Sequence, residues 1–191
     1  MPKQGMGPIR REQICRSAAK AIAERGFPGS TMRVVAEGAG VSTGMLNHYF
    51  KNRADMLMQT LVFVSEGMNE RCSEAVGPVP PGEARVRALI EKALPTDEQT
   101  TEAWRVWIAS YGEAVRSEAL RETIESRLKP WYDVLDFTLE GHAPTRENSE
   151  VPLSWELDAL LNGLAIQWLT AKPDMDLGDI EEALIAFIRE A

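Results

Sequence analysis

The chain has 191 residues, of which 44% are apolar, and it carries 21 Lys and Arg against 29 Asp and Glu, a formal net charge of −8. This composition is typical of a folded globular protein, the two cysteines are too few for a disulfide framework, and no long apolar run suggests a membrane span. The first residues lack the apolar segment of a secretion signal, so we expect a cytoplasmic protein. Taken alone, the negative charge argues against a nucleic-acid partner, because duplex DNA is a polyanion.

The charge is unevenly distributed along the chain. Residues 1–60 hold nine Lys and Arg but four Asp and Glu, which gives +5, so residues 61–191 carry −13. This partition predicts two parts with different partners, although chance and solvated helix faces could also produce it.

The N-terminal third predicts four helices. Apolar residues at helical spacing begin near Ile9 and continue to Gly26, a residue suited to ending a helix. Two short helices and one long helix follow, separated by turns rich in glycine. The polar residues placed to cap these three helices are Ser30 or Thr31, then Ser42, then Asn52.

Helical periodicity resumes after residues 77–82 (GPVPPG), which form the clearest breaker in the chain. The segments that we expect to be helical are 83–94, 97–115, 117–140, 152–171 and 179–190. No alternating, β-branched strand pattern and no internal repeat stands out. The sequence therefore predicts an all-α protein.

Residues 31–57 (TMRVVAEGAGVSTGMLNHYFKNRADML) predict two short helices joined by a turn at Gly40. A small apolar core would fix the angle between them, and it comprises Val34, Val35, Ala36, Ala39, Val41, Leu46 and Phe50. This arrangement is a helix-turn-helix, whose second helix enters the major groove. The small residues 42–44 let its N-terminus approach bases and phosphates. The predicted DNA-binding residues are Thr31, Arg33, Ser42, Thr43, Gly44, Asn47, His48, Tyr49, Lys51 and Arg53.

The same segment resembles the DNA-binding domain of the TetR family of transcriptional repressors. The residues that match the family pattern are Thr31, Ala36, Ala39, Gly40, Val41, Ser42, Gly44, Leu46, Phe50 and Leu57. Two positions depart from it, because Asn47 replaces the usual tyrosine and Arg53 the usual lysine. Arg53 can still bind a phosphate, and Tyr49 can supply the missing tyrosine contact or pack against the following helix. His48 could likewise cap or pack rather than contact DNA.

All five tryptophans lie after residue 100. Aromatic side chains in a helical bundle often form core, but ring faces can also hold a quaternary ammonium group by cation–π attraction. A carboxylate such as Glu113, Asp133 or Asp136 would add to that attraction. The predicted ligand-binding residues are Trp104, Trp107, Tyr111, Trp131 and Trp168.

The resemblance extends to the BetI-type repressors of this family through IRREQI, WRVWIASY and LDALLNGLAIQWL. It implies that the effector is choline or a similar organic cation, and a lipophilic or polyamine ligand is the alternative.

We expect domain boundaries at 1–51 for the helix-turn-helix domain, 52–76 for a connecting helix, and 77–191 for a ligand-binding and dimerisation bundle.

A homodimer is expected because two helix-turn-helix units read a palindromic operator. The stripes that could form an intersubunit four-helix bundle comprise Leu157, Leu160, Leu161, Leu164, Ile180, Leu184 and Phe187. Packing within one subunit would produce the same stripes.

The function predicted from the sequence is a repressor released from its operator by a small-molecule effector. An enzyme is disfavoured, because the chain has two histidines, two distant cysteines and no nucleophile elbow or phosphate-binding loop. No cofactor, metal or membrane partner is expected. A helical scaffold without DNA affinity is disfavoured by the basic N-terminal motif.

Overall fold

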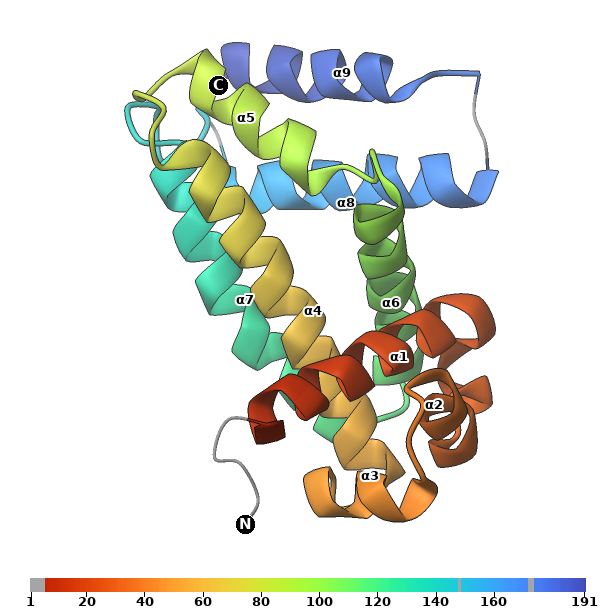
Figure 1. The fold of residues 1–191 in the computed structure, drawn as a ribbon. Coiled ribbons are helices and arrows are strands. Elements are labelled where there is room, and N and C mark those ends of the chain that lie inside the picture. Colours follow the sequence, from red (N-terminus) through yellow and green to blue (C-terminus); the bar gives the residue numbers. More distant parts are fainter. Residues whose placement is uncertain (1–5, 148, 172–173) are drawn as a thin grey trace. The chain divides into compact units, whose positions relative to one another are not determined.

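The computed structural model describes residues 6–147, 149–171 and 174–191 (Figure 1). Within these residues the chain forms nine α-helices and no strand, apart from an isolated bridge between Thr145 and Pro152. The helices are α1 (Met6–Gly29), α2 (Met32–Gly38), α3 (Thr43–Tyr49), α4 (Arg53–Val76), α5 (Glu83–Ala93), α6 (Glu98–Ala114), α7 (Glu118–Thr138), α8 (Leu153–Ala171) and α9 (Leu177–Arg189). The predicted all-α class is confirmed.

The helix ends follow the predicted capping residues. The five helices expected after the breaker differ from the observed ones by at most two residues at either end. The first regular helical segment ends at Gly26, as expected, although α1 continues past this kink to Gly29. Gly26 has φ of 66° and ψ of 178°, a backbone conformation that favours glycine, and one further helical turn containing Pro28 follows it.

The described chain divides into two compact units, which are described separately below. The first unit contains residues 6–66 and Arg105–Ser126, and the second contains Gly67–Trp104 together with residues 127–191. Neither unit is a continuous stretch of chain, since α4, α6 and α7 each contribute residues to both.

In the first unit, α1 packs against α2, and α2 packs against α3. The contact between α1 and α2 is close, because a Cβ atom added to Gly38 would lie 2.5 Å from the Ser17 hydroxyl oxygen. That hydroxyl donates a hydrogen bond of 2.9 Å to the main-chain carbonyl of Val35. Of the predicted helix-turn-helix core, Val35, Ala36, Leu46 and Phe50 are buried, whereas the other members are partly buried.

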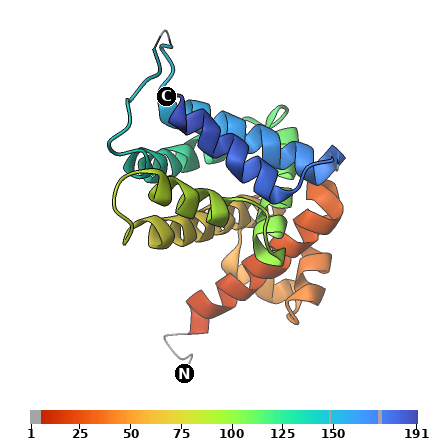
Figure 2. The ribbon, with the colours of Figure 1, turned by 90° about the horizontal axis from the view of Figure 1, so that it is seen from above.

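In the second unit, α9 packs against both α5 and α8, and α8 and α9 lie side by side (Figure 2). The core of this unit draws on α4 through Cys72 and Val76, and on every later helix of the unit. Three ionic contacts also join α5 to α9, one of them between Arg87 and Glu182 at 2.7 Å. Arg87 bonds Glu181 at 3.0 Å, and Arg189 bonds Glu83 at 2.7 Å.

The predicted dimerisation stripes are largely internal to one chain. Leu157, Leu161, Ile180 and Leu184 are at most 1% exposed and belong to the core of the second unit, so their surfaces are already covered. This corrects the expectation that they contact a second subunit. The physical reason is that helical periodicity identifies the buried face of a helix but not the surface that buries it. The stripe residues that are only partly buried are Leu160, Leu164 and Phe187.

Among the described residues, no helix has the length and apolar character needed to span a membrane.

The close approach of Gly38 to Ser17 predicts a strong coupling between these two residues. Gly38→Ala forces the Ser17 hydroxyl to rotate and give up its bond to Val35, so we expect the free energy of unfolding to fall by about 1 kcal/mol. In a Ser17→Ala background the same substitution should be neutral or stabilising, because alanine replaces glycine in a helix without a clash. Urea unfolding of the four proteins measures the coupling, and an equal cost in both backgrounds would contradict this packing.

Candidate DNA-binding surface and effector site

Two hydroxyl caps fix the starts of the helices in the helix-turn-helix. Thr31 Oγ1 accepts from the main-chain N–H of Val34 at 3.3 Å, and Ser42 Oγ accepts from that of Met45 at 3.2 Å. Both caps satisfy N–H groups that have no partner within their helix. Thr31 and Ser42 therefore position α2 and α3, in addition to any contact that they make with DNA.

Helix α3 presents a polar face on which three neighbouring side chains have no hydrogen-bond partner in the described chain. These are Thr43, Asn47 and His48, and all three are exposed. Thr43 and Asn47 are four residues apart and thus share one side of the helix. Gly44 is exposed beside them, and Lys51 follows the helix with an exposed side chain. A face with uncommitted donors and acceptors is what base and phosphate recognition requires.

Arg33 on α2 is also exposed, but it forms an ion pair with a neighbouring residue. Its Nε lies 2.9 Å from a carboxylate oxygen of Glu37, one helical turn further along. With the Arg33 side chain 83% exposed, this pair is weak, and the guanidinium can be drawn from it by a phosphate.

Arg53 makes hydrogen bonds to main-chain carbonyls of its own unit. Its guanidinium donates from Nε to the main-chain carbonyl of Ser30 at 3.0 Å and from Nη2 to that of Phe27. The side chain is partly buried at these carbonyls, which follow the kink in α1. Arg53 therefore fixes the start of α4 to the segment preceding α2, and a phosphate contact by its guanidinium stays a prediction.

Arg11 has a related task that the sequence did not reveal. It donates to the main-chain carbonyl of Tyr49 at 3.2 Å and to Gln59 Oε1 at 2.9 Å. Its guanidinium also lies 5.8 Å from the centre of the Phe50 ring. Arg11 thus joins α1 to the end of α3 and to α4, which holds the polar face of α3 in place.

The aromatic residues predicted to bind ligand on α6 fall in two environments. Trp104 is 6% exposed in the core of the second unit, and its indole N–H donates to the Ala93 carbonyl at 2.7 Å. Trp107 and Tyr111 belong to the first unit, where their ring centres are 5.6 Å apart. Trp104 therefore has a packing role, and its contact with ligand stays a prediction, as do those of Trp107 and Tyr111.

Trp131 and Trp168 both pack partly buried against the core of the second unit. No ring contact joins either of them to Trp104 within the described residues. Trp131 instead donates its indole N–H to Asp158 Oδ1 at 2.7 Å. Trp131 is thus the member of the predicted set that meets a carboxylate, and the contacts of Trp131 and Trp168 with ligand stay predictions.

Asp158 on α8 is the centre of a polar cluster in otherwise apolar surroundings. Besides Trp131, it accepts hydrogen bonds from the Tyr132 hydroxyl at 3.3 Å and from the Asn162 amide at 2.8 Å. Burial raises the pKa of the Asp158 carboxyl above its usual value, although these three hydrogen bonds act in the opposite direction. The Tyr132 ring is stacked on that of Trp155, with ring centres 5.0 Å apart.

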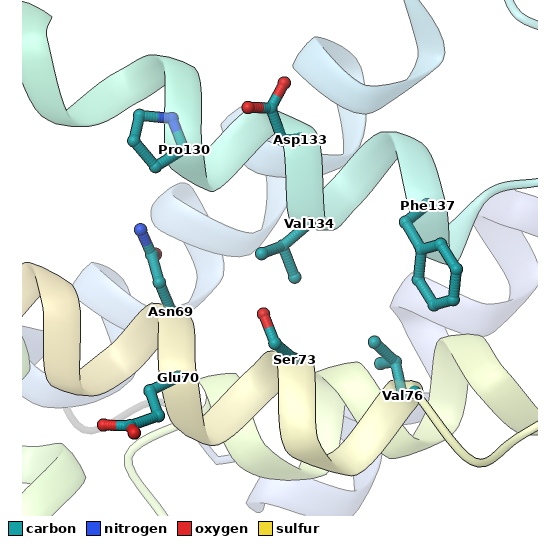
Figure 3. Close-up of a pocket in the computed structure, with 9 residues that line it drawn as sticks. Asn69, Glu70, Ser73, Val76, Pro130, Asp133, Val134 and Phe137 are labelled. Atoms are coloured by element: carbon teal, nitrogen blue, oxygen red, sulfur yellow. The ribbon is translucent and has the colours of Figure 1, made fainter.

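A groove of about 510 Å³ separates α4 from α7 within the second unit. The residues that line it are Asn69, Glu70, Ser73, Val76, Gly77, Pro130, Asp133, Val134 and Phe137. Figure 3 shows the carboxylates of Glu70 and Asp133 pointing away from the space between the two helices. The Phe137 ring already faces the Arg85 guanidinium at 4.3 Å. The groove has the size of a ligand site, but its interior is poorly suited to a cation.

The comparisons with known proteins agree with this architecture. Residues 81–191 match the family described as BetI-type transcriptional repressor, C-terminal, and residues 14–60 match bacterial regulatory proteins of the tetR family. The first match alone covers more than half of the chain. The chain belongs to the BetI-type TetR family. It is a transcriptional regulator and not an enzyme, as the sequence predicted.

Individual relatives of this TetR-family regulator match over most of its length. The HTH-type transcriptional regulator BetI of Klebsiella pneumoniae (strain 342) is 28% identical over 173 residues, which cover 90% of this chain and 86% of that protein. A TetR-family regulator from a Rhodococcus species has a solved structure with a TM-score of 0.81 and 27% identity, covering 94% and 96% of the two chains. A regulator from Saccharomonospora viridis, solved in complex with choline, shares the fold at 24% identity and a TM-score of 0.81, covering 95% and 96%.

Sequence reasoning missed Arg11, Tyr132, Trp155 and Asp158 in this regulator. One signal was available for Asp158, because it is the single acidic residue within LDALLNGLAIQWL, a segment of α8 that is otherwise almost entirely apolar. No comparable signal marked Arg11, since basic residues are common in the N-terminal third.

The exposed lysine after α3 predicts a specific effect on DNA binding. Lys51→Ala should weaken binding to the intergenic DNA beside the gene severalfold, and it should lower the slope of log K against log salt by about one, as loss of one phosphate contact does. Gel shifts at several salt concentrations measure both quantities. Arg121→Ala, which removes an exposed positive charge from α7 in the same unit, is the control and should leave the slope unchanged. Equal effects of both variants would remove Lys51 from the DNA-binding surface.

The raised pKa of Asp158 predicts that this carboxylate destabilises the free protein at neutral pH. A carboxyl with a raised pKa contributes stability below its ordinary pKa of about 3.9, and this contribution is lost as pH rises through the higher value. Asp158→Asn, which keeps a hydrogen-bonding group of the same shape, should therefore raise the Tm at pH 7.

The gain in Tm for Asp158→Asn should shrink as the pH is lowered towards 4, because the wild-type carboxyl is then increasingly protonated. Calorimetry at the two pH values tests this. Asp136→Asn alters an exposed carboxyl on α7 and serves as the matched control, for which we expect little change. If Asp158→Asn instead lowers the Tm by the same amount at pH 7 and at pH 4, burying the Asp158 charge does not cost stability.

Proposed function

We propose that this regulator is a repressor that binds a palindromic operator as a homodimer in the cytoplasm and is released by an organic cation. The observation that carries the DNA-binding part is the exposed face of α3, where Thr43, Asn47 and His48 have no partner in the described chain. The match of residues 81–191 to BetI-type repressors supports the effector class, and so does the choline in the structure of the Saccharomonospora viridis relative.

The charge distribution supports this division of tasks. The N-terminal 60 residues carry +5 and the rest of the chain −13, so the first segment attracts a polyanion and the remainder attracts a cation. The acidic part also disfavours contact with DNA away from α3.

The mechanism that we infer is a shift between two conformations with different affinities for the operator. Effector binding in the second unit would favour the conformation with the lower DNA affinity. Helix α4 can carry the change, because it runs without interruption from Arg53 in the first unit to Val76 in the second. By linkage, operator DNA must weaken effector binding by the same factor.

Dimerisation rests on the side chains of α8 and α9 that the single chain leaves partly uncovered. These comprise Leu160, Leu164 and Phe187 of the predicted stripes, together with Ile166 and Trp168. Helix α8 is apolar around most of its circumference, which is typical of a helix covered on more than one side. A second copy would place two recognition helices about 34–36 Å apart, or a multiple of it, on a palindrome.

A ligand panel tests the effector class. Choline at about a hundredfold excess over its Kd should raise the Tm by about 5–10 °C, because a ligand at that excess adds about 2.7 kcal/mol to the stability of a chain of this length. The same concentration should release the operator in gel shifts. Stabilisation by a fatty-acid derivative or a polyamine, with none by choline, would overturn the choice of organic cation and favour the alternative effectors.

A further inference from the structure

Met45 is an exposed apolar residue on a helix whose accessible face is otherwise polar. Its side chain is 37% exposed, and no other large apolar side chain between residues 32 and 76, all of which the structure describes, is exposed to that extent. The other exposed side chains of α3 are those of Thr43, Asn47 and His48. An exposed methionine forgoes most of the free energy that its burial would supply, so the packing of the first unit gives no reason for an apolar side chain here.

Gly44, the residue before Met45, leaves the centre of this face without a side chain. Successive residues are about 100° apart around an α-helix, so Gly44 lies nearly opposite the buried Leu46. Outside its own helix, a Cβ atom added to Gly44 would meet only the Ser42 hydroxyl oxygen among the described residues, at 3.8 Å, and the backbone here has helical angles that any residue adopts. Glycine lowers helix stability relative to alanine, and neither conformation nor packing requires it at this position. It does permit another molecule to approach the helix closely.

Met45 and Thr43 flank Gly44 on opposite sides. Each lies about 100° from Gly44 around the helix, and Asn47, four residues after Thr43, extends the polar flank. His48, four residues after Gly44, continues the line between the two flanks. A molecule that approaches α3 at Gly44 therefore meets hydrogen-bonding groups on one side and the Met45 side chain on the other.

The major groove of DNA presents one apolar group, the methyl group on C5 of thymine. The other groups that identify a base in that groove are hydrogen-bond donors and acceptors, to which a thioether offers at most a weak acceptor. Placing Met45 against such a group would remove water from it without replacing the lost hydrogen bond. The methionine side chain is unbranched and flexible, so its end can adapt to a methyl group. Met45 therefore favours thymine over the other three bases at the position that it reaches.

We propose that Met45 determines part of the sequence specificity of this regulator by contacting the methyl group of a thymine in each operator half-site. The main-chain N–H of Met45 donates to Ser42 Oγ at 3.2 Å, which fixes the place of this residue in α3. The proposal rests on the proposed function, because it takes α3 as the helix that enters the major groove.

Replacement of thymine by deoxyuridine tests the contact, because it removes only the methyl group from the DNA. Footprinting with the full-length regulator first locates the operator in the intergenic DNA beside the gene. Gel shifts then use one synthetic duplex for each thymine of the protected segment. At one thymine in each half-site, the substitution should lower the affinity of the wild type about fourfold, as loss of one buried methyl-sized group predicts, and about fifteenfold when both half-sites are substituted.

Met45→Ala should lose the dependence on this methyl group. Deoxyuridine at the same thymine should leave the affinity of Met45→Ala within about twofold, because the contact is already absent. Met45→Leu keeps an apolar side chain of similar size and should restore most of the fourfold difference. Val115→Ala removes apolar surface from an 80% exposed residue of the same unit, and this control should behave as the wild type does. Circular dichroism verifies that each variant is folded.

The results that would overturn the contact can be told apart. If the wild type protects an operator, but deoxyuridine affects Met45→Ala at every thymine as it affects the wild type, Met45 contacts no thymine methyl group and the proposed function stands. If Thr43→Ser, which removes a methyl group but keeps the hydroxyl, abolishes the dependence while Met45→Ala retains it, Thr43 makes the contact instead. If the wild type protects no segment of the intergenic DNA, the proposed function fails together with this contact.

Discussion

Where a helix kinks or ends, main-chain carbonyl groups lose their hydrogen-bond partners within the helix and need donors from elsewhere. In both units of this protein an arginine supplies such donors. In the first unit, Arg53 donates to the carbonyls of Phe27 and Ser30, just after the kink in α1. In the second, Arg85 is 5% exposed and donates to the carbonyls of Val79 and Phe137. A guanidinium has five N–H donors in a fixed plane, so it can bond two chain segments at once, which a lysine does less well.

This use of arginine connects the fold to the function. Arg53 is the first residue of α4, so any movement of that helix start is passed to the carbonyls before α2 and hence to the helix-turn-helix. Arg11 adds a second connection from α1 and α4 to the end of α3. Two of the nine basic residues among the first 60 therefore hold the DNA-binding surface in shape, and the charge left to meet phosphate is smaller than the count suggests.

Local signals in the sequence predicted local structure well. The hydroxyl residues Thr31 and Ser42 cap the helices they were expected to cap, and Asn52 accepts from the main-chain N–H of Asp55 at 2.9 Å. Long-range partners were not predictable in this way. Arg53 lies 23 residues from Ser30, and nothing in the sequence indicates that its partner is a carbonyl and not a phosphate.

The same limit explains the dimer stripes and the ligand residues. The helical spacing of the leucines on α8 indicates that they are buried but not by which chain. Leu157 is buried by its own chain, whereas Leu160 keeps exposed surface. The role of a tryptophan is equally hard to predict from sequence. Trp104 donates its indole N–H to a carbonyl in the core, whereas Trp131 donates its indole N–H to a carboxylate. The distinguishing feature is the hydrogen-bond partner of each indole, which only the tertiary structure supplies.

An unpaired carboxylate in α8 has no advantage for folding, because an apolar side chain of similar size would pack there without loss of hydration. The three neutral donors around Asp158 offset part of this cost, because each hydrogen bond favours the charged carboxylate whereas burial disfavours it. Burial remains the larger effect, since the pKa of Asp158 lies above its usual value. The charge of Asp158 therefore lowers the stability of the free protein at neutral pH, and the hydrogen bonds limit how much stability is lost.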